Sequence, residues 1–560
     1  MRNKKEKVRM FGLAGTAGVT ENLYVYEYLP NGRDPKEMIV VDCGVGFPEQ
    51  GMYGVDLIIP DFTYLEKNKH KIKGIVITHG HEDHFGALPF LLKKLKAPIY
   101  ASKLTAGFIR DKLRDHEIKN YKLKVINLEK DEIKLGKFKL TPFRVCHSVP
   151  DTAAFCIDTP LGKMFHVSDY KFDWTPVDKR PFNIAKAAAL ASEGVLGLAS
   201  DCLGSTSPGY TESESSIEGR IETIVEKAKG KVYFTTISSN ISRMQQAINV
   251  AKRQGRKVCL IGRSVVVKAE IAKEMGYLKY PDSLVIDPKK ARRMNKDQIL
   301  YIISGSYGQP GSALYRIATD DHRYLSVEEG DTVIFSGDPA PPGSKTNVDF
   351  LVDRFFEKNI DVHYYDMQED LHVSGHGSME DIKLLFGIVK PKHFIPIGGT
   401  IRHMRAYSEI AQSMGAKKEE VFETAAGEIV EFDREGARQK GKIDVKSVLV
   451  DGLGVGDVGN VVLRDRQVLA QDGVVMVVLQ FDMNQQNLHE KPEIISRGFV
   501  FEKETKDFLH QAENSLFQKL KKKRVINSHQ LKTETVNHLE HYFNDKIGRR
   551  PMILPVVVEV

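Results

Sequence analysis

Three histidines and an aspartate lie within six residues, directly after a short apolar run. The run 75–77 predicts a buried strand, and the loop after it carries His79, His81, Asp83 and His84. Burying so many polar groups at a strand end is costly unless a cation holds them together. His79 and His81 can converge on one ion, because the glycine between them lets the backbone turn, and Asp83 and His84 then lie at a neighbouring position. Ligands in two groups are typical of a two-metal centre, where a bridging water becomes a hydroxide nucleophile at neutral pH. The alternative interpretation is a solvated histidine-rich loop.

Two further predicted strands end in residues that suit the same centre. His147 ends a strand that begins at Phe143, and Asp169 follows the run 165–167. Taken singly, such residues are more often core histidines and strand-end caps, but two ions need about three ligands each and a bridging carboxylate. Asp42, at the end of another predicted strand, is placed either to support a histidine ligand through a hydrogen bond or to cap a turn.

Small polar residues follow several strands in the middle of the chain. From Thr211 to about Gly337 short strands alternate with longer helices, the pattern of a parallel sheet covered by helices. Ligands bind at the carboxyl ends of such strands, and hydroxyl and backbone N–H groups suit phosphate oxygens. Ser239, Asn240 and Arg263 are therefore candidate phosphate contacts, although ordinary turn chemistry explains each of them singly.

A second histidine-containing loop precedes a predicted helix at 379–389. The backbone amides at the start of that helix would face an anion. The loop is a further candidate for phosphate binding through His372, Ser374, Gly375, His376 and Ser378.

The composition indicates a globular protein of more than one domain. The chain has 560 residues, 41% hydrophobic and 28% charged, and this length exceeds what one core usually serves. Lys and Arg number 81 against 74 Asp and Glu, so the net charge of +7 permits a polyanionic partner. Five cysteines without a C-x-x-C pair predict reduced thiols, and the longest apolar run, 474–479, is too short to span a bilayer. We expect a cytoplasmic protein with no membrane partner.

The order of these motifs resembles that of the metallo-β-lactamase fold, whose members include dinuclear metal hydrolases. The alternating region at about 211–350, followed by His372-Val373-Ser374-Gly375-His376, resembles the β-CASP branch, whose members cut nucleic acids. Over nearly the whole chain the resemblance is to the bacterial ribonuclease J family, and it rests on the stretches 41–44, 54–61, 451–459, 494–499 and 549–555.

The resemblance implies an α/β architecture: a metallo-β-lactamase αββα sandwich, an inserted β-CASP α/β domain and a small α/β C-terminal domain. We place the first part of the sandwich at 1–210, the β-CASP domain at 211–350, the rest of the sandwich at 351–430, a linker at 431–448 and a C-terminal oligomerisation domain at 449–560.

The resemblance also implies a metal-dependent ribonuclease in RNA maturation and decay. Family members act as 5′→3′ exonucleases on 5′-monophosphorylated RNA, with some endonuclease activity, and assemble as homodimers or homotetramers or pair with a paralogue. Two divalent ions are implied, zinc or else manganese or magnesium.

Roles for individual residues follow from the same resemblance. His79, His81 and His147 would hold one ion, Asp83 and His84 the other, and Asp169 would bridge them. Proton transfer would fall to Asp83 and His376, and the 5′ phosphate would lie against Ser374, Gly375 and Ser378.

The sequence departs from the family at one ligand position. The family has a further histidine in an Ile-Pro-Val-His-Gly-Glu context, where this chain has Gly398, which cannot coordinate a metal. The second ion should therefore bind more weakly or be missing, unless His393 or His403 reaches it. The family's Asp-Ser-Thr-Asn is also changed, to Asp201-Cys202-Leu203-Gly204.

Two alternatives to an active ribonuclease stay open. A weakly catalytic or non-catalytic RNA-binding subunit that pairs with an active paralogue would explain Gly398. A small-molecule hydrolase, such as a lactonase or thioesterase, would share the 79–84 motif but would not need the inserted and C-terminal domains.

Overall fold

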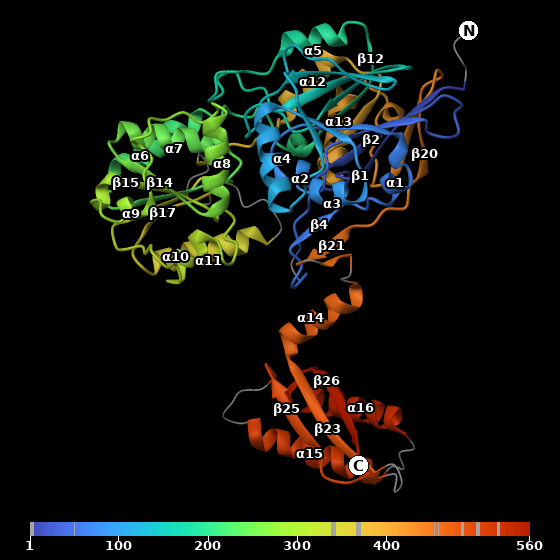
Figure 1. Ribbon diagram of the computed structural model, residues 1–560, viewed down its shortest axis with the longest axis vertical. Coiled ribbons are helices and arrows are strands. Elements are labelled where there is room, and N and C mark those ends of the chain that lie inside the picture. Colours follow the sequence, from blue (N-terminus) through green and yellow to red (C-terminus); the bar gives the residue numbers. More distant parts are fainter. Residues whose placement is uncertain are drawn as a thin grey trace. The chain divides into compact units, whose positions relative to one another are not determined.

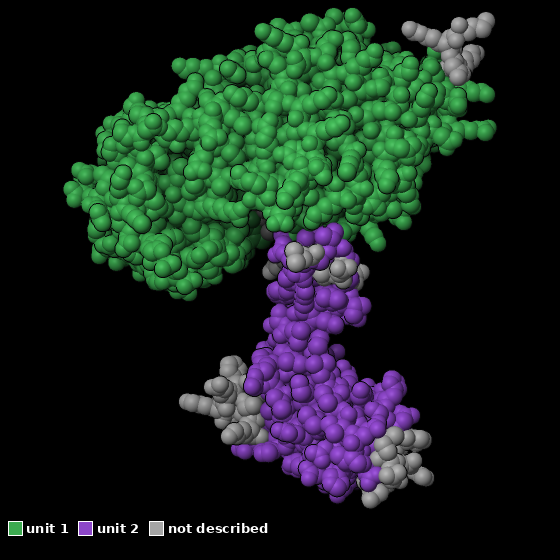
Figure 2. All heavy atoms as spheres, in the orientation of Figure 1, with its two compact units in different colours: residues 1–47, 57–448 green, residues 48–56, 449–560 purple. Residues whose placement is uncertain are grey.

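A computed structural model describes residues 5–49, 51–337, 343–365, 371–452, 454–456, 459–482, 487–499, 505–522 and 527–560. The stretch 451–459 lies partly outside these residues, at 453, 457 and 458. The chain forms two compact units, residues 1–47 with 57–448 and residues 48–56 with 449–560, which are coloured separately in Figure 2.

Two mixed sheets form the centre of the larger unit. The first has the order β20-β19-β1-β2-β3-β5-β6-β7 and the second the order β18-β12-β11-β10-β9-β8. The strands of the first are β1 (Lys7–Ala14), β2 (Leu23–Leu29), β3 (Glu37–Val41), β5 (Ile72–Ile77), β6 (Pro98–Ala101), β7 (Lys122–Val125), β19 (Glu428–Phe432) and β20 (Ala437–Lys442). Those of the second are β8 (Ile133–Leu135), β9 (Phe138–Arg144), β10 (Ala153–Thr159), β11 (Gly162–Val167), β12 (Val195–Asp201) and β18 (Phe394–Ile397).

The two sheets share one apolar core and carry helices on their outer faces. Tyr26 and Ile39 from the first sheet cluster with Phe138 and Phe155 from the second, all fully buried. A second cluster packs helices against the other face of the second sheet. The helices of this part are α1 (Thr63–Lys67), α2 (Glu82–Phe85), α3 (Leu88–Lys94), α4 (Lys103–Asp115), α5 (Ile184–Ala191), α12 (Met379–Val389) and α13 (Ile401–Ser413). This helix–sheet–sheet–helix arrangement confirms the predicted sandwich.

The inserted domain is a five-stranded parallel sheet between two layers of helices. Its order is β14-β15-β13-β16-β17, and α6, α7 and α8 lie on one side with α10 and α11 on the other (Figure 1). Its strands are β13 (Val232–Thr235), β14 (Lys257–Ile261), β15 (Ile299–Ile303), β16 (Thr332–Phe335) and β17 (Asp361–His363). Its helices are α6 (Ser216–Lys227), α7 (Ile241–Arg253), α8 (Arg263–Glu274), α9 (Pro288–Ala291), α10 (Ala313–Ala318) and α11 (Ser344–Phe356).

The smaller unit has its own sheet and core. Strands β23 (Val474–Asp482), β24 (Asn487–Leu488) and β25 (Glu493–Arg497) are antiparallel, and β26 (Met552–Glu559) pairs with β23 in parallel. Helices α15 (Thr505–Lys521) and α16 (Ser528–Ile547) cover one face of this sheet with apolar residues, and α14 (Asn460–Asp472) precedes β23.

The predicted linker at 431–448 is wrong over part of its length. Phe432 ends β19, and residues 437–442 form β20, the edge strand of the first sheet. The side chains of β20 are almost all exposed, so this strand shows no apolar alternation and its sequence resembles a loop.

The five cysteines are buried free thiols. Within the part of the chain that the structure describes, no helix combines the length and the apolar character needed to cross a membrane.

Candidate metal centre and catalytic site

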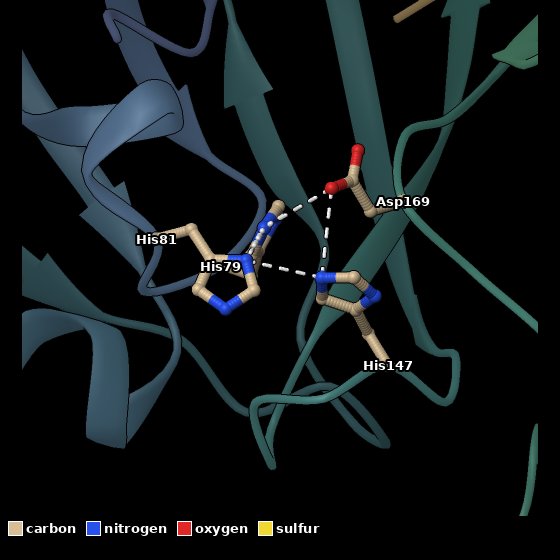
Figure 3. Close-up of side chains that lie close together, drawn as sticks. All are labelled: His79, His81, His147 and Asp169. Atoms are coloured by element: carbon tan, nitrogen blue, oxygen red, sulfur yellow. Dashed lines mark hydrogen bonds and ion pairs between the residues drawn. The ribbon is translucent and has the colours of Figure 1, made fainter. Parts of the chain in front are cut away.

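Four of the predicted ligands converge between the two sheets. His79 and His81 follow β5, His147 follows β9, and Asp169 follows β11. His81 Nδ1 lies 3.1 Å from both His79 Nε2 and His147 Nε2, and Asp169 Oδ2 lies 3.6 Å from His79 Nε2 and 3.5 Å from His147 Nε2. The four side chains point toward one another in Figure 3, and their ligand atoms all lie within 4.8 Å of one another.

These separations fit a tetrahedral metal ion. Ligand atoms at the usual zinc distances would lie roughly 3.3 Å apart, and the four separations given above are 3.1–3.6 Å. Burial lowers the pKa of His79 and His147 well below the ordinary value, and it lowers the pKa of His81 to about 4. The three imidazoles are therefore neutral at pH 7 and present lone pairs, which is the form that binds a metal.

A second group of ligand atoms lies beside the first. His84 Nε2 lies 3.4 Å from Asp169 Oδ1 and 3.5 Å from Asp83 Oδ2. The two oxygens of Asp169 therefore face the two groups separately, as a bridging carboxylate would. Burial lowers the pKa of His84, but the charges of Asp169, Asp83 and Asp42 outweigh it and raise the pKa well above its usual value. Three carboxylates around one ring favour positive charge at this position, and a divalent ion would supply it.

Asp42 is hydrogen-bonded to His84, which is one of the two roles that its position in the sequence leaves open. Its buried carboxylate accepts hydrogen bonds from His84 Nδ1, at 2.8 Å, and from the backbone N–H and hydroxyl of Thr78. The Nδ1–H group is committed to Asp42, so Nε2 of His84 faces Asp83 and Asp169.

Gly398 leaves the second group without a further ligand. It has φ +69°, and a Cβ atom there would lie 3.6 Å from Asp201 Oδ1. His403 Nδ1 accepts from the backbone N–H of Thr400 and lies 3.1 Å from its hydroxyl, so this ring caps α13. His393 precedes β18, whereas Gly398 follows it, and the His393 ring packs on phenylalanines. Neither histidine replaces the missing ligand.

His376 and Asp201 form a second dyad at the edge of the centre. His376 Nδ1 donates to Asp201 Oδ2 at 2.7 Å, and His376 Nε2 lies 3.9 Å from Asp169 Oδ2. Burial lowers the pKa of His376, but Asp201 and then Asp169 outweigh it and raise the pKa to about 9. At pH 7 the ring is therefore an imidazolium that can donate a proton from Nε2.

Asp201 is a functional residue that the sequence reasoning missed. It ends β12, which pairs in parallel with β11 on one side and with β18 on the other. Parallel neighbours end at the same sheet edge, so Asp169, Asp201 and Gly398 lie side by side. The changed Asp201–Gly204 motif was the available signal, but the strand order was needed to place it.

The 372–378 loop is hydrogen-bonded to the proposed ligand His147 and to a buried lysine, Lys171. Gly375 O accepts from His147 Nδ1 at 2.7 Å, and a Cβ atom on Gly375 would lie 2.6 Å from His147 Cε1. Lys171 Nζ donates to Ser374 O at 3.0 Å. His372 is partly buried, and desolvation lowers its pKa to about 3. Lys171 is a further residue that sequence patterns did not indicate.

Several predicted phosphate contacts also have structural partners. Ser378 caps α12 and lies 2.9 Å from the Thr211 hydroxyl, and Asn240 caps α7. Ser239 is buried, and the exposed Arg263 pairs with Asp115 at 2.7 Å. Their contact with RNA stays a prediction.

The comparisons with known proteins agree with this geometry. Residues 19–186 match the metallo-beta-lactamase superfamily, residues 229–355 the "Ribonuclease J, beta-CASP domain" and residues 461–560 the "Ribonuclease J C-terminal domain". Over 559 residues the chain is 36% identical to Ribonuclease J 1 of Streptococcus pyogenes, covering 99% of this chain and 98% of that one. It is 35% identical to Ribonuclease J2 of Bacillus subtilis, covering 99% of both chains, and 32% identical to Ribonuclease J 2 of Staphylococcus aureus over their full lengths.

A solved structure shares the fold. A protein of unknown function from Enterococcus faecalis aligns with a TM-score of 0.51 and 15% identity, covering 76% of this chain and all of that one. The fold and the site together define a metallo-β-lactamase protein with an inserted β-CASP domain. Within that class, the chain belongs to the ribonuclease J family.

Proposed function

We propose that this metal-dependent ribonuclease degrades RNA from its 5′ end, favouring 5′-monophosphorylated RNA, and that it also cuts internally. The observation that carries the proposal is a neutral three-histidine cluster beside a protonated His376. Such a pair offers both metal-binding lone pairs and a general acid within one centre.

His79, His81, His147 and Asp169 would hold the first ion, and Asp83, His84 and Asp169 the second. When bound, divalent ions activate water and neutralise charge on the phosphate. Because histidine nitrogens dominate the first group, zinc suits it best. The second group has a majority of oxygen atoms and lacks a residue at 398, so we propose weaker binding there and a preference for manganese or magnesium.

The chain's own groups complete the reaction. His376, charged at pH 7 and aimed at the centre, would protonate the leaving 3′ oxygen, while Asp201 keeps it charged and oriented. Asp83 is one-fifth exposed and would accept a proton from the attacking water. The 372–378 loop, with its helix N-terminus, would hold the 5′ phosphate.

We further propose that the smaller unit mediates self-association. The face of its sheet opposite α15 and α16 exposes between 40% and 44% of each of five apolar side chains, Met476, Ile495, Leu554, Val556 and Val558. A contiguous apolar strip of this kind is typical of homo-oligomer interfaces. The buried thiols fit a reducing cytoplasm.

The proposal is tested by digesting a 5′-monophosphorylated RNA and its 5′-triphosphate twin. Metal-stripped protein receives Zn²⁺, Mn²⁺ or Mg²⁺, and the products are resolved by length. Mononucleotides arising mainly from the monophosphate are expected. RNA that is bound but left whole under every metal would instead indicate a non-catalytic subunit that pairs with an active paralogue.

A further inference from the structure

A pocket of about 360 Å³ lies at the carboxyl end of β14, lined by residues of β14, of α8, of the start of α9 and of the segment 322–325. Its walls are mostly apolar and include Leu260, Val266, Val267 and Leu325. Its size falls in the range of small-molecule sites, which spans roughly 300–1,000 Å³. None of the reaction steps above uses this pocket.

The pocket is also lined by an exposed tyrosine and by a histidine whose ring is held by hydrogen bonds. Tyr324 is 51% exposed. His322 Nδ1 accepts hydrogen bonds from the backbone N–H groups of Tyr324 and Leu325, at 3.3 and 3.1 Å. The neutral ring therefore carries its proton on Nε2, which is a donor for a ligand.

Two arginines lie beside the ring. Arg292 and Arg323 lie 5.7 and 5.0 Å from the centre of the Tyr324 ring. Two lysines of the same stretch are ion-paired, Lys290 with Asp287 and Lys296 with Glu328. Among the described residues, no carboxylate lies within ion-pair distance of the four other exposed cations, Lys289, Arg292, Arg293 and Arg323. We call these four residues, with Tyr324 and the pocket, the basic pocket surface.

We propose that the basic pocket surface is a second binding site for single-stranded RNA, separate from the metal centre, with a nucleobase against Tyr324 and in the pocket and phosphates on the four cations. Two arginines lie beside an exposed aromatic ring, and Lys289 and Arg293 belong to the same segment as Arg292, which suits the repeating phosphates and bases of a single strand. A flexible single strand can also place one base in a pocket, whereas a duplex cannot. The inference rests on the proposed ribonuclease function.

The position of the surface suits RNA that also reaches the metal centre. The pocket lies at the carboxyl edge of the parallel sheet, where ligands of such sheets bind. Val266 and Val267 of helix α8 line the pocket. The next residue of the helix, Lys268, places its Nζ 3.6 Å from Oε1 of Glu82, and Glu82 stands between the proposed ligands His81 and Asp83 in the sequence. One helix thus contacts both the pocket and the metal loop.

The test compares RNA of two lengths on the full-length protein. Binding of 5′-monophosphorylated oligonucleotides of about four and about 20 nucleotides is measured by fluorescence anisotropy with metal removed, so that the RNA stays whole. Tyr324→Ala should weaken binding of the longer RNA about tenfold, the size expected for loss of one stacked base, and should leave the shorter RNA unaffected. Tyr324→Phe, which keeps the ring, should retain wild-type affinity for both.

Charge reversal supplies the second measurement. For the longer RNA, the logarithm of the binding constant falls linearly with the logarithm of the salt concentration. In the variant K289E/R292E/R293E the steepness of this line should fall by at least about 0.7 for each cation removed. The control K440E/K442E reverses two exposed lysines on β20, in the same compact unit but on the first sheet of the sandwich, and should have a much smaller effect.

Each outcome decides the inference. Unchanged affinity for the longer RNA in Tyr324→Ala and in the triple variant would overturn it, and would leave the surface to an acidic protein partner. Equal losses for both lengths would place the effect at the metal centre instead. Failure of the wild-type protein to bind or cleave any RNA would refute the proposed function itself, so the two failures are distinguishable.

Discussion

Replacing Asp201 with Asn tests whether His376 acts as an acid that Asp201 keeps charged. The substitution conserves size and the oxygen that accepts from the Leu203 N–H, but removes the charge 2.7 Å from His376 Nδ1. Asp201 is the largest of the effects that raise the pKa of His376 from 6.5 to about 9. A shift of that size corresponds to a preference of about 3 kcal/mol for the charged ring.

The magnitude follows from the fraction of charged His376. A group with raised pKa is fully charged below its ordinary value and loses its proton as pH rises through the folded-state pKa. At about pH 8 the wild-type ring is roughly nine-tenths charged, whereas a ring returned to a pKa near 6.5 is only about 3% charged. Asp201→Asn should therefore lower the single-turnover cleavage rate about thirtyfold at about pH 8 and less than twofold at about pH 6.

The assay is single-turnover hydrolysis of 5′-monophosphorylated RNA across that pH range, with bound metal measured in each sample. Asp173→Asn removes another buried carboxylate, one that accepts from the backbone N–H of Glu214, and should leave the shape of the pH profile unchanged. A uniform loss at every pH in Asp201→Asn, or an unchanged profile, would refute the acid role of His376.

Other variants test the remaining parts of the centre. Asp42→Asn should weaken metal affinity about 10- to 100-fold in a metal titration, with the fold retained, because His84 loses its carboxylate partner. Unchanged metal affinity would contradict the role of Asp42 in positioning His84. Gly398→His should raise the affinity for the second ion and, with it, the rate of RNA cleavage, despite a backbone cost of about 1 kcal/mol at φ +69°. No gain in bound metal would show that the native centre needs no ligand at position 398. L554K/V556K should shift the protein toward monomers in analytical ultracentrifugation, and an unchanged mass would exclude this face as the interface.

Elements and ligands that carry a strong local pattern can be predicted from the sequence alone. The helix 379–389 has the bounds in the structure that the sequence predicts, and the run 75–77 lies in the buried strand β5. The six proposed ligands were found because histidines and carboxylates are unusual at the ends of buried strands. Their side chains lie close together in the structure, and metal binding by them stays a prediction.

The features that sequence reasoning missed depend on strand order or on packing. Asp201 acquires its role only because β12 lies between β11 and β18. Lys171 follows Asp169 as an unremarkable basic residue, and only its contact with Ser374 O reveals that it holds the loop. The pocket beside Tyr324 joins segments more than 60 residues apart, which no local pattern indicates. Strand β20 was mistaken for a linker because its side chains face water.

The most direct test of the metal-dependent centre measures RNA cleavage and bound metal together, in the wild type and in His81→Ala. His81 Nδ1 lies 3.1 Å from two other ligand atoms, so its loss should remove tight metal binding and lower cleavage by orders of magnitude while the circular dichroism spectrum stays unchanged. Wild-type cleavage should fall to background on chelation and return in proportion to the metal bound. Cleavage that persists without metal, or that is equal in His81→Ala, would contradict the assignment of this cluster as the catalytic centre.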